Sequence, residues 1–154
     1  MRIRGQLSDT DILSLSQFDQ KTLSSLFRST KKIIQLVANN KCSNVLKGSV
    51  VALLFFEPST RTHNSFSSAV QRLGAGVIGI QDTSVTSMSK GESFEDTIRM
   101  YNNYADLIVI RHPEEGSAKR AADVASAPVI NAGDGGNEHP TQGLLDLYTI
   151  HARF

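Results

Sequence analysis

The residue types that are best suited to chemistry stand together in one short run, Ser59-Thr60-Arg61-Thr62. The run offers three hydroxyl groups and a guanidinium with a fixed positive charge. Residues 50–54 before it are apolar and predict a buried strand, and an apolar helix face follows, formed by Phe66, Ala69, Val70 and Leu73. The run therefore falls at a helix N-terminus, where unpaired N–H groups and the helix dipole favour anions. This pattern predicts a site for phosphate or another compact oxyanion, although Ser and Thr are also common helix caps.

A second polar segment, residues 131–142, has the same setting. It contains several glycines, follows the strand-like residues 128–130 and precedes a helical pattern that starts near Leu144. In an open α/β sheet, ligands bind where such turns converge at the carboxyl ends of the strands. We therefore expect this segment and the first run to converge at one edge of the sheet.

The elements that must position these residues alternate between helices and strands. Strands are predicted at residues 49–56, 77–80, 107–110 and 129–132, and helices at 19–39, 60–73, 93–104, 114–125 and 141–152, with a long polar loop at 82–91. Alternating strands and helices predict an α/β fold with a parallel sheet and right-handed crossovers. The first helix carries an apolar stripe made of Leu23, Leu26, Phe27, Ile33, Ile34 and Val37.

Composition narrows the function further. The chain has 154 residues, 40% of them hydrophobic, and a net charge of +1, which gives no electrostatic reason to expect binding to nucleic acid or to a membrane. No apolar run reaches membrane-spanning length, and the basic residues near Met1 precede no signal-peptide core. The single cysteine, Cys42, excludes an internal disulfide and a multi-cysteine metal site, so we expect a cytoplasmic protein without a metal.

Two motifs together resemble the carbamoyltransferase family. They are Phe-x-Glu-Pro-Ser-Thr-Arg-Thr at residues 55–62 and His-Pro-Thr-Gln at residues 139–142, and residues 82–99 and 107–116 match in order between them. Pro58 and Thr141 favour the aspartate branch over the ornithine branch, which usually has Cys in place of Thr141. The resemblance implies that residues 1–154 form the N-terminal carbamoyl-phosphate-binding domain, with the C-terminal aspartate-binding domain absent. It also implies a four-stranded parallel sheet with helices on both faces, a Rossmann-like three-layer arrangement.

The implied reaction transfers the carbamoyl group of carbamoyl phosphate to L-aspartate, giving N-carbamoyl-L-aspartate and phosphate in de novo pyrimidine biosynthesis. It includes no redox or electron-sink step, so no cofactor is expected. The resemblance assigns the phosphate to residues 59–62, with Arg61 also near the bridging oxygen. It places Arg111 at the phosphate and the carbonyl oxygen, lets His139 donate to that oxygen, and has Gln142 accept from the carbamoyl NH₂. Thr62, Arg111 and His139 would together act as an oxyanion hole.

The polar loop has an implied role in assembly. In the carbamoyltransferases a Ser and a Lys of this loop enter the neighbouring subunit's active site in a homotrimer, and Ser87 and Lys90 match them best. Regulatory chains are a further partner that the resemblance allows. L-Aspartate should bind only with the second domain, so the chain alone is expected to bind carbamoyl phosphate without turnover. We also expect Glu57 to pair with a basic residue of the other domain or to orient Arg61, and Asp134 and Glu138 to act as local turn acceptors.

Several alternatives to this assignment exist. By residue type alone, Arg111 could be an exposed strand-end arginine and His139 a simple turn residue. The chain could belong to the ornithine branch, or it could be a non-catalytic relative or a phosphate-binding module. A stand-alone dinucleotide-binding domain should carry Gly-x-Gly-x-x-Gly after its first strand, and Glu57-Pro58-Ser59 does not match that pattern.

Overall fold

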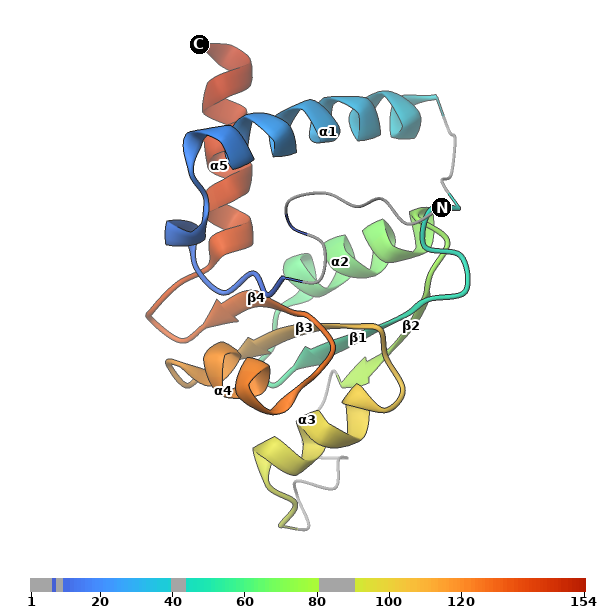
Figure 1. Cartoon of the computed structure of the whole chain (residues 1–154), viewed down its shortest axis with the longest axis vertical. Helices are drawn as coiled ribbons and strands as arrows, with labels where there is room; N and C mark the ends of the chain where they lie inside the picture. Colours follow the sequence, from blue (N-terminus) through green and yellow to red (C-terminus); the bar gives the residue numbers. More distant parts are fainter. Residues whose placement is uncertain (1–6, 8–9, 40–43, 81–90) are drawn as a thin grey trace.

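The computed structural model describes residue 7 and residues 10–39, 44–80 and 91–154. Along the chain a short 3₁₀ helix, η1, is followed by alternating helices and strands (Figure 1). Their bounds are η1 Leu15–Gln17, α1 Gln20–Ala38, β1 Val50–Phe55, α2 Thr60–Arg72, β2 Gly76–Ile80, α3 Phe94–Asn102, β3 Leu107–His112, α4 Ser117–Val124, β4 Val129–Asp134 and α5 Pro140–Arg153.

The four strands form one parallel sheet in the order β2-β1-β3-β4. From β1 the chain crosses over α2 to β2 on one side, whereas from β3 it crosses over α4 to β4 on the other. Right-handed crossovers in opposite directions place their helices on opposite faces of the sheet. The strand order therefore reverses between β1 and β3, and this is where open α/β sheets form their binding crevice.

Alternate residues of the strands pack into two separate cores, as the two-residue period of a strand requires. On one face Ala52 and Leu54 of β1 pack with Ile98 of α3 and Ala121 of α4, all fully buried. On the other face β1 packs against α2. The buried members of this second core are Val51, Leu53, Phe55, Val70, Ala75, Val109 and Ala132. Helices thus cover both faces of the parallel sheet, which confirms the predicted fold class.

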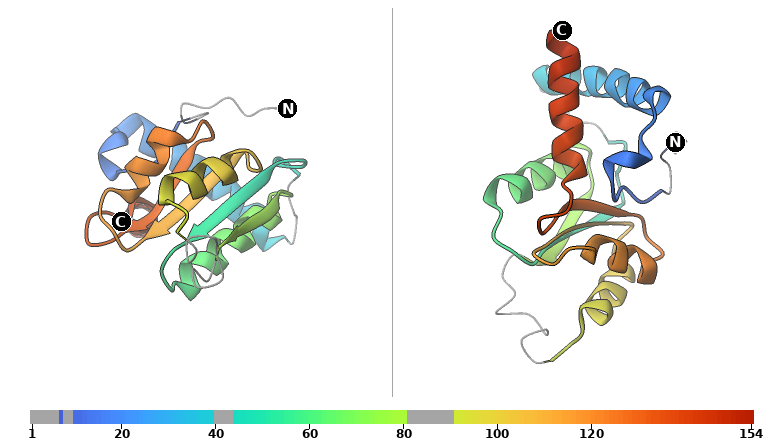
Figure 2. Two further views of the ribbon diagram at one scale, coloured as in Figure 1. Left: turned by 90° about the horizontal axis from the view of Figure 1, so that it is seen from below. Right: turned by 90° about the vertical axis from the view of Figure 1, so that its left-hand side faces the viewer.

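α1 and α5 extend away from the sheet and cross each other (Figures 1 and 2). They meet through Phe27, whose ring lies 5.4 Å from that of Tyr148 and 5.1 Å from that of His151. The prediction of an apolar stripe on α1 is correct in sequence, but the second half of the stripe is not buried. Ile34 is 50% exposed, and α5 exposes Leu145 and Ile150 at 57% each. These helices therefore present uncovered apolar surface.

The predicted helices and strands all occur, with boundaries shifted by a few residues. The main shift is in α4, which begins at Ser117 rather than near residue 114 because Gly116 adopts a left-handed conformation (φ 78°) that is not helical. Two features were not predicted from the sequence. They are η1 and the isolated parallel bridge between Ile12 and Ile130, which adds the N-terminal segment to the edge of the sheet.

Candidate active site

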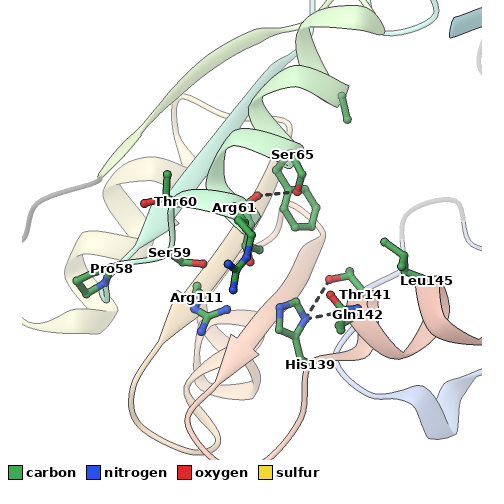
Figure 3. Close-up of a pocket in the computed structure, with 13 residues that line it drawn as sticks. Pro58, Ser59, Thr60, Arg61, Ser65, Arg111, His139, Thr141, Gln142 and Leu145 are labelled. Carbon is green, nitrogen blue, oxygen red and sulfur yellow. Dashed lines mark hydrogen bonds between the residues drawn. The ribbon is translucent and has the colours of Figure 1, made fainter. Parts of the chain in front are cut away.

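An open cleft of about 800 Å³ lies at the carboxyl edge of the sheet, between the N-termini of α2 and α5 (Figure 3). The residues that line it come from the turn after β1, from the end of β3 and from the start of α5. They are Pro58, Ser59, Thr60, Arg61, Thr62, Ser65, Phe66, Ala69, Arg111, His139, Thr141, Gln142 and Leu145.

The N-terminus of α2 forms one wall of this cleft. Ser59 is the N-cap residue by position, but its side chain makes no capping hydrogen bond. The first helical bond runs from His63 N–H to the Ser59 carbonyl at 3.0 Å, so the amides of residues 60–62 have no partner within the helix. The Ser59 hydroxyl is therefore not used as a helix cap. With its free amides, this end of the helix is suited to binding an anion.

Arg61 and Arg111 bring two guanidinium groups to the cleft from α2 and β3 (Figure 3). Within the described part of the chain Arg61 forms no ion pair, whereas Arg111 Nε donates to Glu57 Oε1 at 2.6 Å. The alternative of an exposed strand-end arginine is wrong for Arg111, whose side chain is only 23% exposed. The prediction that Glu57 orients Arg61 is also wrong, because the register sets Arg111 beside Phe55, two residues before Glu57. One carboxylate against two arginines leaves this part of the cleft positive.

An irregularity in β4 makes room for Arg111. The register between β3 and β4 shifts, because His112 follows Ile110 by two positions whereas its partner Asp134 follows Asn131 by three. Gly133 lies in this bulge with φ 121°, and a Cβ there would lie 3.3 Å from Arg111 Nη1 and 3.4 Å from His139 Cδ2. Both side chains therefore pack over the bare backbone of Gly133. Bulges commonly re-aim side chains beside active sites in this way.

His139 is the N-cap residue of α5, and its imidazole lines the cleft. Its Nδ1 accepts from the Gln142 N–H at 3.3 Å and lies at the same distance from Thr141 Oγ1. A backbone N–H can only donate, so the ring proton resides on Nε2, which becomes a donor. Burial first, and the charge of Arg111 second, lower the pKa of His139 below its ordinary value. The ring is therefore a neutral donor at neutral pH.

Gln142 lies in the first turn of α5, and its side chain is hydrogen-bonded along the helix. Its Nε2 donates to Asp146 Oδ1 at 3.0 Å. The bond uses the nitrogen of the amide and fixes the orientation of the group, so the amide oxygen is the acceptor that Gln142 can offer to a ligand.

The turn that carries His139 is built around the buried carboxylate of Asp134. Burial acts to raise its pKa, but hydrogen bonds from Asn137, Asn131 and the backbone N–H groups of Glu138 and Gly116 outweigh burial and lower it. The prediction of a local turn acceptor is thus correct for Asp134. It is wrong for Glu138, which accepts from Ser14 Oγ and Leu15 N–H at the far end of the sequence.

The structure brings most of the predicted site residues to one cleft, namely Ser59, Thr60, Arg61, Thr62, Arg111, His139 and Gln142. Ser87, Lys90 and Cys42 lie outside the described residues. Glu57 was expected from the sequence to have another partner than Arg111, and a role for Gly133 was not predicted. No spacing pattern in the sequence points to the role of either residue, because both roles depend on the pairing of strands that are far apart in the chain.

The remaining histidines of the sheet edge have packing partners. His63 is half-buried, with its ring 5.0 Å from that of Phe55. His112 packs between Phe56 and Phe94, and its Nδ1 accepts from Glu114 N–H. In the part of the chain that the structure describes, no group of His, Cys, Asp or Glu could hold a metal ion. A search of the same residues finds no helix with the length and apolarity of a membrane span.

Fold and cleft together define an α/β domain with a cationic, donor-rich anion site at the switch point of its sheet. Residues 10–152 match the model of the aspartate/ornithine carbamoyltransferase family, carbamoyl-P binding domain. The chain belongs to this family.

Relatives and solved structures agree with the family assignment. The chain is 49% identical to the aspartate carbamoyltransferase catalytic subunit of Thermococcus gammatolerans over 94% of its own length and 47% of the relative's. It superposes with a TM-score of 0.92 and 38% identity on aspartate transcarbamoylase from Trypanosoma cruzi in complex with N-(phosphonacetyl)-L-aspartic acid, covering 96% of this chain and 46% of the other. The same enzyme in complex with carbamoyl phosphate and aspartate gives a TM-score of 0.91, again at 38% identity, covering 95% and 48%. The chain therefore spans about half the length of the relatives it matches.

Proposed function

We propose that the cleft binds carbamoyl phosphate and that the chain supplies the carbamoyl-phosphate half of an aspartate carbamoyltransferase. The observation that carries the proposal is the convergence of the α2 N-terminus, Arg111 and His139 on one cleft. The solved structure of the Trypanosoma cruzi enzyme with carbamoyl phosphate and aspartate supports it by analogy. Residues 1–154 would then form one domain.

In this proposal the phosphate occupies the N-terminus of α2. The amides and hydroxyls of residues 59–62 donate to its oxygens, and Arg61 adds charge at the bridging oxygen. The carbonyl oxygen lies toward Arg111 and His139, with the Nε2–H of His139 as its donor. Gln142 accepts from the carbamoyl NH₂ through its amide oxygen. The ligand would thus span the cleft from α2 to α5.

The chemistry then follows from the placement of these donors. The neutral aspartate amine attacks the carbonyl carbon and a tetrahedral oxyanion forms. The C–O bond to phosphate then breaks, and the departing phosphate takes the proton that the amine nitrogen loses. Thr62, Arg111 and His139 stabilise the negative charge that develops on the carbonyl oxygen, and Arg61 stabilises the leaving phosphate. Holding the amine and the carbonyl carbon in the geometry of attack lowers the activation free energy further. L-Aspartate would be held mainly by residues of the other half of the enzyme.

Assembly belongs to the same proposal. By the family resemblance, Ser87 and Lys90 complete the cleft of a neighbouring subunit in a homotrimer. The exposed apolar surface of α1 and α5 would contact the other half of the enzyme, because the chain spans about half the length of its relatives. Cytoplasmic location and a place in pyrimidine biosynthesis go with this assignment. Light scattering on the chain with and without ligand tests the trimer, and a purely monomeric species would argue against the role of Lys90 in trans.

The proposed ligand is tested by measuring whether the chain prefers a ligand with a carbamoyl group to phosphate alone. Phosphonoacetamide, in which a methylene replaces the bridging oxygen of carbamoyl phosphate, serves as a stable probe beside inorganic phosphate. Calorimetry should show tighter binding of phosphonoacetamide than of phosphate. His139→Ala should abolish most of that difference while phosphate affinity stays the same, because His139 faces the carbonyl end. The proposal would be contradicted if His139→Ala weakened the binding of both ligands equally, or if the parent chain bound phosphate as tightly as phosphonoacetamide.

A further inference from the structure

The N-terminal segment of residues 11–17, here called the strap, lies along the edge of β4 (Figures 1 and 2). Ile12 N–H donates to the Val129 carbonyl, and Asn131 N–H donates to the Ile12 carbonyl, both at 2.8 Å. The Asp11 carboxylate accepts from Val129 N–H at 2.8 Å. The strap thus forms one parallel bridge at the edge of the sheet, just before the chain enters the turn that carries His139.

Glu138 ties the far end of the strap to that turn. Its Oε1 accepts from Ser14 Oγ at 2.8 Å and its Oε2 accepts from Leu15 N–H at 2.9 Å, so both carboxylate oxygens are engaged. Glu138 does not line the cleft, although it is the residue immediately before His139. Its carboxylate is therefore directed to the strap and away from the proposed phosphate.

A second contact joins the strap to α5 beyond His139. Gly143 lies in the first turn of α5, and a Cβ at that position would overlap the side chain of Leu15. The absence of a side chain lets Leu15 pack directly against the helix. The strap consequently contacts the start of α5 on both sides of His139, at residues 138 and 143.

The orientation of the His139 ring depends on this part of the backbone. The hydrogen bond from Gln142 N–H to Nδ1 measures 3.3 Å, which is long for a hydrogen bond with an N–H donor. A weak bond of this kind does not fix the ring against movement of the turn. The strap adds contacts to the backbone of residues 138–143, beside the bond that Asp134 Oδ1 accepts from Glu138 N–H and the bond that the His139 carbonyl accepts from Gly143 N–H.

We propose that Glu138 is a positioning residue, whose two hydrogen bonds clamp the strap onto the start of α5 and thereby hold His139 in the cleft. The inference rests on the proposed function where it concerns ligand affinity. The clamp acts through hydrogen bonds and not through the charge of the carboxylate, and this distinction can be tested.

Two substitutions at the same position separate hydrogen bonding from charge. In Glu138→Gln the amide oxygen can accept from Leu15 N–H while the amide nitrogen donates to the Ser14 hydroxyl, which is also an acceptor. Glu138→Ala removes both bonds. We expect E138A to weaken phosphonoacetamide binding about three- to tenfold in calorimetry, and E138Q to stay within about twofold of the parent chain. Equal weakening in both variants would overturn the clamp, because it would identify the charge as the active feature.

Measurements without any ligand test the clamp independently of the proposed function. E138A should accelerate hydrogen exchange at Leu15 N–H about tenfold or more and broaden the imidazole NMR signals of His139, whereas E138Q should change neither. Unchanged exchange and unchanged His139 signals in folded E138A would overturn the inference. If the parent chain fails to bind phosphonoacetamide, the proposed function fails while these two readouts still decide the clamp.

Two further variants guard against a trivial loss of the fold. Asp123→Ala removes an exposed carboxylate that pairs with Lys119 on α4, and it should leave every readout unchanged. Ser14→Ala removes one of the two clamp bonds, together with the bond that Ser14 Oγ accepts from Ser16 N–H within the strap, and it should produce a smaller effect in the same direction as E138A. If E138A does not fold, S14A decides the matter, and a folded S14A with parent-like exchange at Leu15 and parent-like His139 signals would overturn the clamp.

Discussion

Arg111 of β3 donates through its Nε to Oε1 of Glu57, in the turn after β1, at 2.6 Å, and both side chains are about three-quarters buried. The bond occupies Nε, and Arg111 Nη1 lies 3.4 Å from the Ala132 carbonyl. A guanidinium held at two of its nitrogens is fixed in orientation, which leaves its remaining N–H donors for a ligand in the cleft. Glu57 therefore acts on the ligand through Arg111.

The first prediction concerns this pair. Glu57→Ala should weaken phosphonoacetamide binding about three- to tenfold, because Arg111 loses the contact that orients it. Glu57→Gln should retain most of the affinity, since an amide oxygen can still accept from Nε. Calorimetry at one ionic strength provides the comparison. Tighter binding by E57A would mean that the carboxylate mainly repels the anion, and the orienting role would then be wrong.

Arg61 offers a second test with a matched control on the same helix. Arg61→Ala should cost about 1.5–3 kcal/mol of phosphate binding free energy, because a charge-assisted contact is lost. Arg72 lies at the opposite end of α2, where its Nε donates to Ser68 Oγ, and Arg72→Ala should leave binding unchanged. Circular dichroism should show the same fold in both. Unchanged phosphate affinity in R61A would identify Arg61 as a solvated helix residue.

His139 should titrate below the ordinary histidine pKa of about 6.5. Burial and the charge of Arg111 lower its pKa, so the folded chain binds this proton less readily than the unfolded chain. The resulting stability is present above the unfolded pKa and is lost as the pH falls through the folded pKa. NMR titration of the imidazole, assigned with His139→Phe, measures the value and shows which nitrogen carries the proton. A pKa above that of an unfolded histidine, or a neutral ring protonated at Nδ1, would contradict the site geometry.

Gly133 should not tolerate a side chain. Gly133→Ala imposes a Cβ at φ 121° and presses it against Arg111 and His139. We expect a loss of about 1–3 kcal/mol in unfolding free energy from backbone strain, together with weaker binding of phosphonoacetamide. Gly48→Ala provides a control, because its φ of 88° is also left-handed but its Cβ would meet no atom within 4 Å. Equal binding by the two variants would show that contact with Arg111 and His139 is unimportant.

The sequence predicted the sheet and one wall of the cleft because both depend on local patterns. Apolar runs marked the strands, and residues 59–62 form a hydroxyl- and arginine-rich helix start that needs no distant partner to be recognised. The Glu57–Arg111 pair could not be predicted in this way, since it depends on the register between β1 and β3, whose residues are 54 positions apart. The strap is similar. A single bridge at Ile12 leaves no two-residue period in the sequence, and the partners of Glu138 lie more than 120 positions away.

NMR mapping of the phosphonoacetamide site tests the central claim most directly. The claim is that one ligand spans the N-termini of α2 and α5. On titration, the backbone amides of Thr60, Arg61 and Thr62 and the Nε2 of His139 should shift together with a single dissociation constant, and R61A should abolish the shifts at both places. Shifts confined to α2, or separate dissociation constants for α2 and His139, would contradict the account.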